Sequence, residues 1–128
     1  MRLMGIDFGT KRVGIALSDE GCKFAIPKAV LPNDRYLFTE IKRLTEVYEV
    51  SEIVMGESKD FKGNDNPIMR NITFFKGELE RGLGLPVHLE PEFFTSHQAE
   101  SVQGKNALLD ASAAALILQS YLDKEKKD

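Results

Sequence analysis

The sequence has one cysteine, no long apolar run and no excess of basic residues. Because Cys22 is the only cysteine, an intrachain disulfide and a thiolate zinc cluster are excluded. No apolar run approaches the ~20 residues that a membrane-spanning helix needs. Lys and Arg number 17 against 20 Asp and Glu, so the net charge of −3 argues against a general nucleic-acid coat protein, although not against a nuclease with an acidic active site. A start without a signal-peptide pattern, together with the lone thiol, favours a cytoplasmic setting.

The sequence does contain a regular succession of strand and helix patterns. Strands are expected over Leu3–Asp7, Arg12–Ser18, Lys23–Leu31, Glu52–Met55 and Pro86–Leu89. Helices are expected after Pro32-Asn33-Asp34 up to Tyr48, from the Asn66-Pro67 cap to Gly82, from Thr95, and over Asn106–Leu122. A meander followed by helix-connected strands favours an α/β fold, with a mixed sheet and helices on both faces. We expect one domain over residues 1–123 and a charged tail at 124–128.

Acidic residues recur where these expected elements begin or end. Asp7 ends the first strand, Glu57 follows the fourth, Glu90 and Glu92 follow the fifth, and Asp110 begins an apolar stripe of the last helix. Function in sheets of this kind gathers at the carboxyl ends of the parallel strands. Converging carboxylates repel one another unless cations lie between them. Oxygen ligands suit Mg²⁺ or Mn²⁺, and such a site is typical of two-metal phosphodiester cleavage.

Each acid also has a purely structural interpretation. Asp7 could accept hydrogen bonds from the turn that follows it, and Asp110 could stabilise the first turn of its helix. Glu57 could be a solvated loop residue, and Glu90 a surface acid at the end of a strand. Asp19 is a useful control because an antiparallel pairing of the first two strands would place it at the far end of the sheet, as a turn residue.

Basic residues flank the expected acidic centre and could hold a phosphate backbone without reading its sequence. The candidate substrate-binding residues are Gly9, Thr10, Lys11, Arg12, Lys59, Lys62 and Lys105. Gly9 would let a backbone approach closely, whereas Arg12 could instead pair with Asp7. Of the two histidines, His88 is expected to be a packed core residue and His97 a surface residue of a capped helix, because they lack zinc-ligand spacing.

Five segments, in this order, resemble the YqgF family, whose members are described as pre-16S rRNA nucleases or Holliday junction resolvase-like proteins. They are GIDFGTKRVGIALSD, IVMG, LPVHL, FFTSHQAE and LLDASAAALILQSYLD, and the resemblance runs from Leu3 to Asp123. It implies a ribonuclease H-like fold with strand order 3-2-1-4-5 and an antiparallel second strand. It also implies a cytoplasmic endonuclease that uses Mg²⁺ or Mn²⁺ on structured nucleic acid, with processing of the 5′ end of pre-16S rRNA as the reaction.

The resemblance assigns the catalytic and metal-binding acids to Asp7, Glu92 and Asp110. The family pattern Asp-Glu-Arg-x-Thr after the fifth strand reads Pro91-Glu92-Phe93-Phe94-Thr95 here, so the central acid is kept and its aspartate and arginine neighbours are replaced. Either Glu57 supplies a further carboxylate, or the protein is a catalytically impaired module that binds nucleic acid. The substrate could be pre-rRNA or branched DNA, and a resolvase of branched DNA would need a dimer, whereas the sequence favours a monomer or a weak homodimer.

The opening segment also resembles the phosphate-loop signature of actin and the sugar kinases, in which a strand-end aspartate precedes Gly-Thr. This alternative predicts an ATP-binding enzyme. Such enzymes close two domains around the nucleotide, and 128 residues provide one. We therefore favour the nuclease interpretation.

Overall fold

The computed structural model describes residues 1–58, 62, 64–91 and 107–125, with only the backbone described for 107–110. The elements are β1 (Arg2–Phe8), β2 (Arg12–Ser18), β3 (Ala25–Pro32), α1 (Leu37–Val47), β4 (Val50–Glu57), α2 (Met69–Leu83), β5 (Val87–Pro91) and α4 (Ala107–Glu125). Five strands form one sheet in the order β3-β2-β1-β4-β5. β2 runs antiparallel to both of its neighbours, whereas β1, β4 and β5 run parallel to one another. The predicted mixed sheet with order 3-2-1-4-5 is confirmed.

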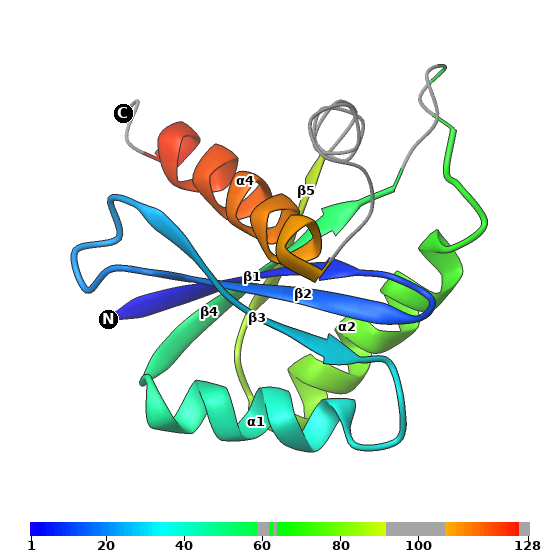
Figure 1. Cartoon of the computed structure of the whole chain (residues 1–128), viewed down its shortest axis with the longest axis horizontal. Helices are drawn as coiled ribbons and strands as arrows, with labels where there is room; N and C mark the ends of the chain where they lie inside the picture. The colour runs from blue at the N-terminus through cyan, green and yellow to red at the C-terminus, as the bar shows by residue number, and fades with distance from the viewer. Residues whose placement is uncertain (59–61, 63, 92–106, 126–128) are drawn as a thin grey trace.

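Helices cover both faces of the sheet, as predicted. Figure 1 shows α4 above the sheet and α1 and α2 below it. We call these sides the α4 face and the α1–α2 face. The core of the α1–α2 face includes Met4, Ile6, Ile15, Ile53, Met55, Ile41, Ile72, Phe75 and Leu79. The core of the α4 face consists of Leu3, Ala16, Val54, Ala114, Ile117, Leu118 and Leu122. Alternate residues of each strand therefore enter different cores, as the two-residue period of a strand requires.

The two helices of the α1–α2 face form where apolar residues recur at helical spacing. Their buried apolar side chains are Leu37, Ile41 and Leu44 in α1, and Met69, Ile72, Phe75 and Leu79 in α2. This spacing of three and four residues places the side chains on one face of each helix. α2 ends at Leu83 and is capped by Gly84, which has φ +69° and whose N–H donates to the carbonyl of Glu80 at 3.0 Å. A left-handed residue of this kind terminates many helices, and glycine adopts it without strain.

The start of β3 differs from the prediction. The strand begins at Ala25 rather than Lys23. The Asp19 carboxylate accepts hydrogen bonds from the backbone N–H groups of Lys23 at 2.7 Å and Phe24 at 2.9 Å. These two donors belong to the turn, so the strand pairing starts after them.

The start of α2 also differs from the prediction. The helix begins at Met69, and the expected side-chain cap by Asn66 is wrong. The Asn66 amide Nδ2 instead donates to Ser58 Oγ at 2.9 Å, and its backbone N–H donates to the Ser58 carbonyl at 2.9 Å. Asn66 therefore fastens the chain to the segment after β4. The helix predicted from Thr95 lies outside the described residues.

The remaining predicted elements are present, with small shifts of their ends. β2 has the predicted bounds, and β4, β5 and α4 extend to Glu57, Pro91 and Glu125, slightly further than predicted. Among the described residues, no helix has the length and apolar character to cross a bilayer.

Candidate active site

Asp7 lies one residue before the end of β1, on the α4 face. Leu3 belongs to the core of that face, and Gly5 contacts α4, so alternation along the strand places Asp7 on the same side. The residue is half-buried and pairs with Gly14 of β2. A partly desolvated carboxylate is therefore held at the carboxyl end of the central strand, as the sequence predicts.

The approach of α4 to β1 is unusually close because Gly5 has no side chain. A Cβ atom at Gly5 would lie 2.7 Å from the carbonyl oxygen of Ala114 and 2.8 Å from the Cβ of Leu118. The helix backbone thus rests directly on the strand at this point. Packing of this kind fixes the position of the helix along the strand, because larger residues at either surface would hold the two apart.

The contact at Gly5 also constrains where Asp110 lies. Asp110 precedes Ala114 by one helical turn, about 6 Å along the axis. Asp7 follows Gly5 by two strand residues, about 7 Å. Figure 1 shows the first turn of α4 towards the end of the sheet where β1 leads into β2, so both displacements run to the same end. The backbone of Asp110 is therefore at the end of the sheet that carries Asp7, while its side chain is outside the described part.

Glu90 occupies the α4 face two strands away from Asp7, and its predicted role is wrong. We expected a surface acid, but only 3% of Glu90 is exposed. Ser120 Oγ donates to its carboxylate at 2.8 Å, and Lys124 Nζ lies 2.7 Å from the same oxygen. Gly56 of β4 pairs with Glu90 of β5. It directly follows Met55, which pairs with Ile6 of β1, so Gly56 lies between Glu90 and Asp7 in the sheet. Glu90 anchors the last turns of α4 to β5.

Glu57 lies on the other face of the sheet from Asp7. It alternates with Ile53 and Met55, which belong to the core of the α1–α2 face. The register of β1 and β4, in which Ile6 pairs with Met55, brings Glu57 level with Phe8 rather than Asp7. The backbone of β4 therefore does not bring these two carboxylates together on one face.

The turn between β1 and β2 is tight and braced. A Cβ atom at Gly9 would lie 2.5 Å from the carbonyl oxygen of Arg12, so only glycine fits. Asn33 Nδ2 donates to the Gly9 carbonyl at 2.7 Å, and the Asn33 N–H donates to the Lys11 carbonyl at 2.9 Å. This brace was not predicted from the sequence, because Asn33 was interpreted only as a helix-start signal. The residues next to Asn33 in the sequence do not indicate that it contacts the turn between β1 and β2.

The predicted basic residues are only partly described. Thr10, Lys11 and Arg12 are exposed in the braced turn, and Lys62 is exposed beyond β4. Lys59 and Lys105 lie outside the described residues, as does the predicted catalytic residue Glu92. The described cations thus lie in the turn that follows β1 and in the segment that follows β4.

Asp19 and His88 lie away from this end of the sheet. Asp19 is the predicted turn residue, and the backbone N–H groups of Phe24 and Lys23 hold its pKa below the ordinary value. His88 was predicted to be packed in the core, but it is half-exposed, with Nε2 2.7 Å from Glu52 Oε1 and its ring stacked on Tyr121. Burial raises the pKa of the Tyr121 hydroxyl, and neighbouring carboxylates raise it further. Asp19 thus holds the turn between β2 and β3, whereas His88 and Tyr121 link β5 to α4 at the opposite edge of the sheet.

Within the described ranges, no three acidic, histidine or cysteine residues are grouped so that they could hold a metal ion. Glu92 and the side chain of Asp110 are outside those ranges, so the predicted set of three acids is represented there by Asp7 alone. The assignment of Asp7, Glu92 and Asp110 as a common site remains a prediction, supported by the backbone positions of Asp7 and Asp110.

Known proteins resemble the chain along its whole length. The family described as "RuvX: Holliday junction resolvase" matches residues 1–124. A protein of Maridesulfovibrio salexigens named "Putative pre-16S rRNA nuclease" is 36% identical over 132 residues, which cover 95% of this chain and 98% of that protein. A protein of the same name from Lactobacillus helveticus is 34% identical over 142 residues and is covered completely, as is this chain.

Solved structures of Holliday junction resolvases share the fold. RuvC of T. thermophilus, in complex with a Holliday junction substrate, has a TM-score of 0.65 at 14% identity, covering 99% of this chain and 97% of that one. The fowlpox virus resolvase, also in complex with junction DNA, has a TM-score of 0.59 at 16% identity, with 99% and 100% covered. At these identities the likeness shows the fold alone. The family match and the full-length relatives give stronger evidence than the fold. They show that the chain belongs to the RuvX family, which is the YqgF family expected from the sequence, and that by this membership it is a nuclease.

Proposed function

We propose that this protein is a divalent-metal-dependent endonuclease that hydrolyses phosphodiester bonds in structured nucleic acid, and that its reaction is processing of the 5′ end of pre-16S rRNA. The names of the full-length relatives support the substrate. The close contact of α4 with Gly5 carries the proposal for the site, because it sets the backbone of Asp110 at the end of the sheet where Asp7 lies. Asp7, Glu92 and Asp110 are the proposed catalytic acids and metal ligands.

The donors proposed for this site fit a hard cation. All three are carboxylates, and Asp7 lies at a half-buried strand end, where a bound cation offsets the cost of burying negative charge. Oxygen-only donors favour Mg²⁺ or Mn²⁺ over zinc. When bound, such ions supply a hydroxide nucleophile and stabilise the leaving oxygen of the phosphodiester.

The basic residues around the turn between β1 and β2 are proposed to position the substrate. Lys11 and Arg12 are exposed there, and the small Gly9 lets a phosphate backbone approach the turn. The brace from Asn33 holds the turn in one shape, so these cations are oriented before the substrate arrives. Thr10, Lys59, Lys62 and Lys105 extend the proposed contact surface. Contacts of this kind set the orientation of the nucleic acid and leave its sequence unread.

A cleavage assay tests the proposal. The full chain is incubated with a 16S rRNA precursor transcript that keeps its 5′ extension, in Mn²⁺, in Mg²⁺ and in chelator. We expect metal-dependent cleavage that falls about a hundredfold or more in Asp7→Asn, because a metal ligand is lost. Asp19→Asn is the matched control and should cleave normally. Equal cleavage by wild type and Asp7→Asn would contradict the proposal, and binding without cleavage in any metal would favour the impaired binding module.

Metal binding tests whether Glu57 is a further metal ligand in addition to the proposed ligand Glu92. The affinity of the chain for Mn²⁺ is measured by titration calorimetry in Glu92→Ala and Glu57→Ala. We expect Glu92→Ala to weaken binding and Glu57→Ala to leave it unchanged, because alternation in β4 puts Glu57 on the α1–α2 face. A loss of affinity in Glu57→Ala would instead show that this acid compensates for the altered segment after β5.

Resolution of branched DNA is the second candidate function. The family description and the fold shared with two junction-bound resolvases favour testing it. Symmetric nicking of a synthetic four-way junction, together with a dimer in sedimentation, would support this function. Cleavage of the rRNA precursor alone, by a monomer or a weak dimer, would support the first.

A further inference from the structure

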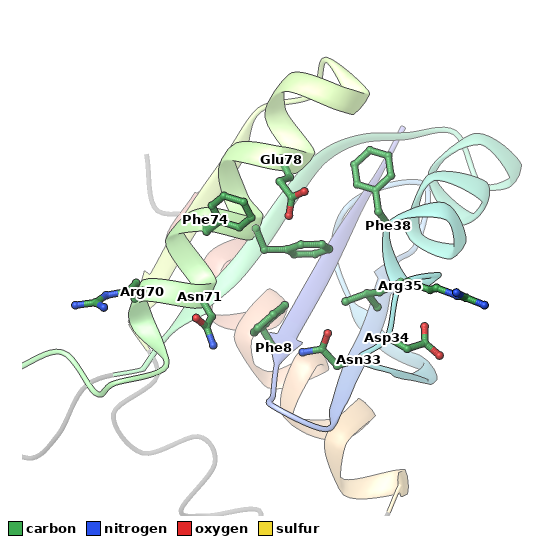
Figure 2. Close-up of a pocket in the computed structure, with 11 residues that line it drawn as sticks. Phe8, Asn33, Asp34, Arg35, Phe38, Arg70, Asn71, Phe74 and Glu78 are labelled. Atoms are coloured by element: carbon green, nitrogen blue, oxygen red, sulfur yellow. The ribbon is translucent and has the colours of Figure 1, made fainter.

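A cavity of about 580 Å³ opens on the α1–α2 face, at the end of β1. Figure 2 shows it between α1 and α2, with Phe8 at its β1 end. Phe8 directly follows Asp7 in the chain, so the cavity is next to the proposed active site but on the opposite side of the sheet. Its volume is within the ~300–1,000 Å³ that is usual for small-molecule pockets.

Four phenylalanines line the cavity. The rings of Phe8 and Phe75 pack against each other, with centroids 5.2 Å apart and an interplanar angle of 39°. Phe38 and Phe74 come from α1 and α2, and Figure 2 shows them on the two sides of the cavity. Phe74 is 65% exposed, although burying a phenylalanine ring is strongly favourable. Exposed rings beside a hollow are suited to stacking on flat ligands.

One carboxylate enters this aromatic environment. Glu78 extends from α2 towards the rings in Figure 2. Within the described ranges it has no ion-pair or hydrogen-bond partner, in contrast to Glu80 two residues later, whose carboxylate lies 3.0 Å from Lys76 Nζ. An acceptor without a protein partner between aromatic rings favours a ligand that has a flat ring and N–H donors on its edge.

Arginines and amides surround the rings. Asn33 and Asn71 lie on either side of Phe8 in Figure 2. Arg70 and Arg35 are exposed and project away from the interior of the cavity. Arg70 and Phe74 also line a second hollow of about 630 Å³. Cations outside an aromatic cavity match a ligand whose base enters it and whose phosphates remain outside.

We propose that this cavity binds an unstacked guanine base of a single-stranded segment of the substrate. Guanine presents two adjacent donors, N1–H and the N2 amino group, and a carboxylate accepts both at once. Adenine, cytosine and uracil each present fewer adjacent donors on that edge. Phe38 and Phe74 stack with the base, Glu78 accepts its two hydrogen bonds, and Arg70 contacts the phosphate. Recognition of splayed bases by aromatic stacking and Watson–Crick-edge hydrogen bonds is the usual mode for single-stranded RNA.

The proposal deepens the proposed function and rests on it, because it makes the cavity a substrate subsite beside the reaction centre. A base held next to Phe8 brings its own phosphates close to the turn of Lys11 and Arg12. Base recognition on the α1–α2 face would then add sequence preference to the phosphate contacts, which have none.

Binding is tested with the full chain in chelator, so that no cleavage occurs. The probes are fluorescein-labelled oligouridines with a single central guanosine, inosine, adenosine or cytidine. We expect guanosine to bind about tenfold more tightly than inosine, because inosine lacks the amino group and one hydrogen bond to a charged acceptor is lost. Glu78→Gln should reduce this ratio to about twofold or less. Glu80→Gln is the matched control and should keep the full ratio.

Phe74→Ala gives an independent test, because an exposed ring is removed with little effect on folding. All four oligonucleotides should bind about tenfold more weakly to this variant. A wild-type chain that binds the guanosine and inosine probes equally would overturn the proposal. So would a Phe74→Ala variant that converts a dimer to a monomer in sedimentation without changing oligonucleotide affinity, since the face would then bind a second copy of the chain.

The two proposals fail in different ways. If Asp7→Asn does not impair cleavage but the guanosine preference is present, the proposed reaction centre is wrong and the base subsite remains. If cleavage depends on Asp7 but the guanosine preference is absent, the subsite is wrong and the nuclease remains.

Discussion

The two faces of the sheet are built from side chains of different size and chemistry. The core of the α1–α2 face consists of large residues such as Met4, Ile6 and Phe75, and no acidic residue in the described part of the chain is buried in it. The α4 face has Gly5 where the helix backbone touches the strand, and it contains the buried Glu90. Large side chains hold a helix away from a sheet, whereas glycine and alanine let the backbones meet. The close approach at Gly5 is the geometry that short acidic side chains from a strand and a helix would need in order to meet.

The largest effect should come from adding bulk where α4 touches β1. We expect Gly5→Val to lower the free energy of unfolding by more than about 3 kcal/mol and to abolish cleavage, because its Cβ would meet a backbone oxygen that cannot move away easily. Urea denaturation and the precursor assay measure the two effects. The control is Gly21→Ala, where the nearest atom is a flexible Asp19 oxygen at 3.4 Å and the change should be within about 0.5 kcal/mol.

Removing a buried side chain from the core of the α1–α2 face should lower the stability of the fold without affecting the proposed active site. Ile41 in α1 is fully buried, so Ile41→Ala should lower the free energy of unfolding by about 3 kcal/mol. At temperatures where the variant is still folded, the cleavage rate per folded molecule should match that of the wild type. A loss of cleavage in the folded variant would show that the two faces are not independent.

The ion pair at the end of α4 should contribute less. Lys124→Met leaves the carboxylate of Glu90, whose side chain is 4% exposed, with the Ser120 hydroxyl as its one remaining partner among the described residues. We expect a loss of about 1–2 kcal/mol in the free energy of unfolding, reduced by the solvent exposure of Lys124. The matched control is Lys76→Met, which breaks a pair whose carboxylate, on Glu80, is 40% exposed, and it should cost about 0.3–0.5 kcal/mol. Equal losses in the two variants would mean that burial of Glu90 adds nothing.

The smallest effect is expected at Asp19, in a turn outside both cores. Backbone N–H groups lower its pKa in the folded chain, so the ionised carboxylate stabilises the fold at pH values above the unfolded value of 3.8. The stability difference between wild type and Asp19→Asn should be constant near neutral pH. It should shrink as the pH falls below 3.8 and the carboxylate becomes protonated in the folded state. A difference that grows on acidification would contradict this assignment.

The sequence predicted the elements well where a single local pattern determined them. β2 has the predicted bounds because its apolar run is enclosed between two turns. The strand order came from the family resemblance, since periodicity alone does not say which strands are neighbours. Asn66 misled the prediction of α2, because a residue that favours helix caps can equally fasten a loop, and here Ser58 is its partner.

The chemistry of the site was less predictable than the fold. A strand-end acid looks the same in the sequence whether it is exposed or buried, and Glu90 is buried because its partners Ser120 and Lys124 are supplied by a helix 30 and 34 positions later. Glu57 was placed near Asp7 from strand adjacency, but adjacency says nothing of which face a side chain occupies. A shift of one residue in the strand register moves a side chain to the other face of the sheet, and the register is known only from the paired strands of the structure.

The position of α4 at the end of the element order has a consequence for biosynthesis. A ribosome completes all five strands before it adds α4, which then covers the sheet against Gly5. Until that helix emerges, a nascent chain has Asp7 but no Asp110, and the surface of the sheet around Gly5 is exposed to water. The proposed hydrolytic centre therefore cannot assemble before α4 has been synthesised, and an RNA-cutting activity would arise only after that helix has packed on the sheet.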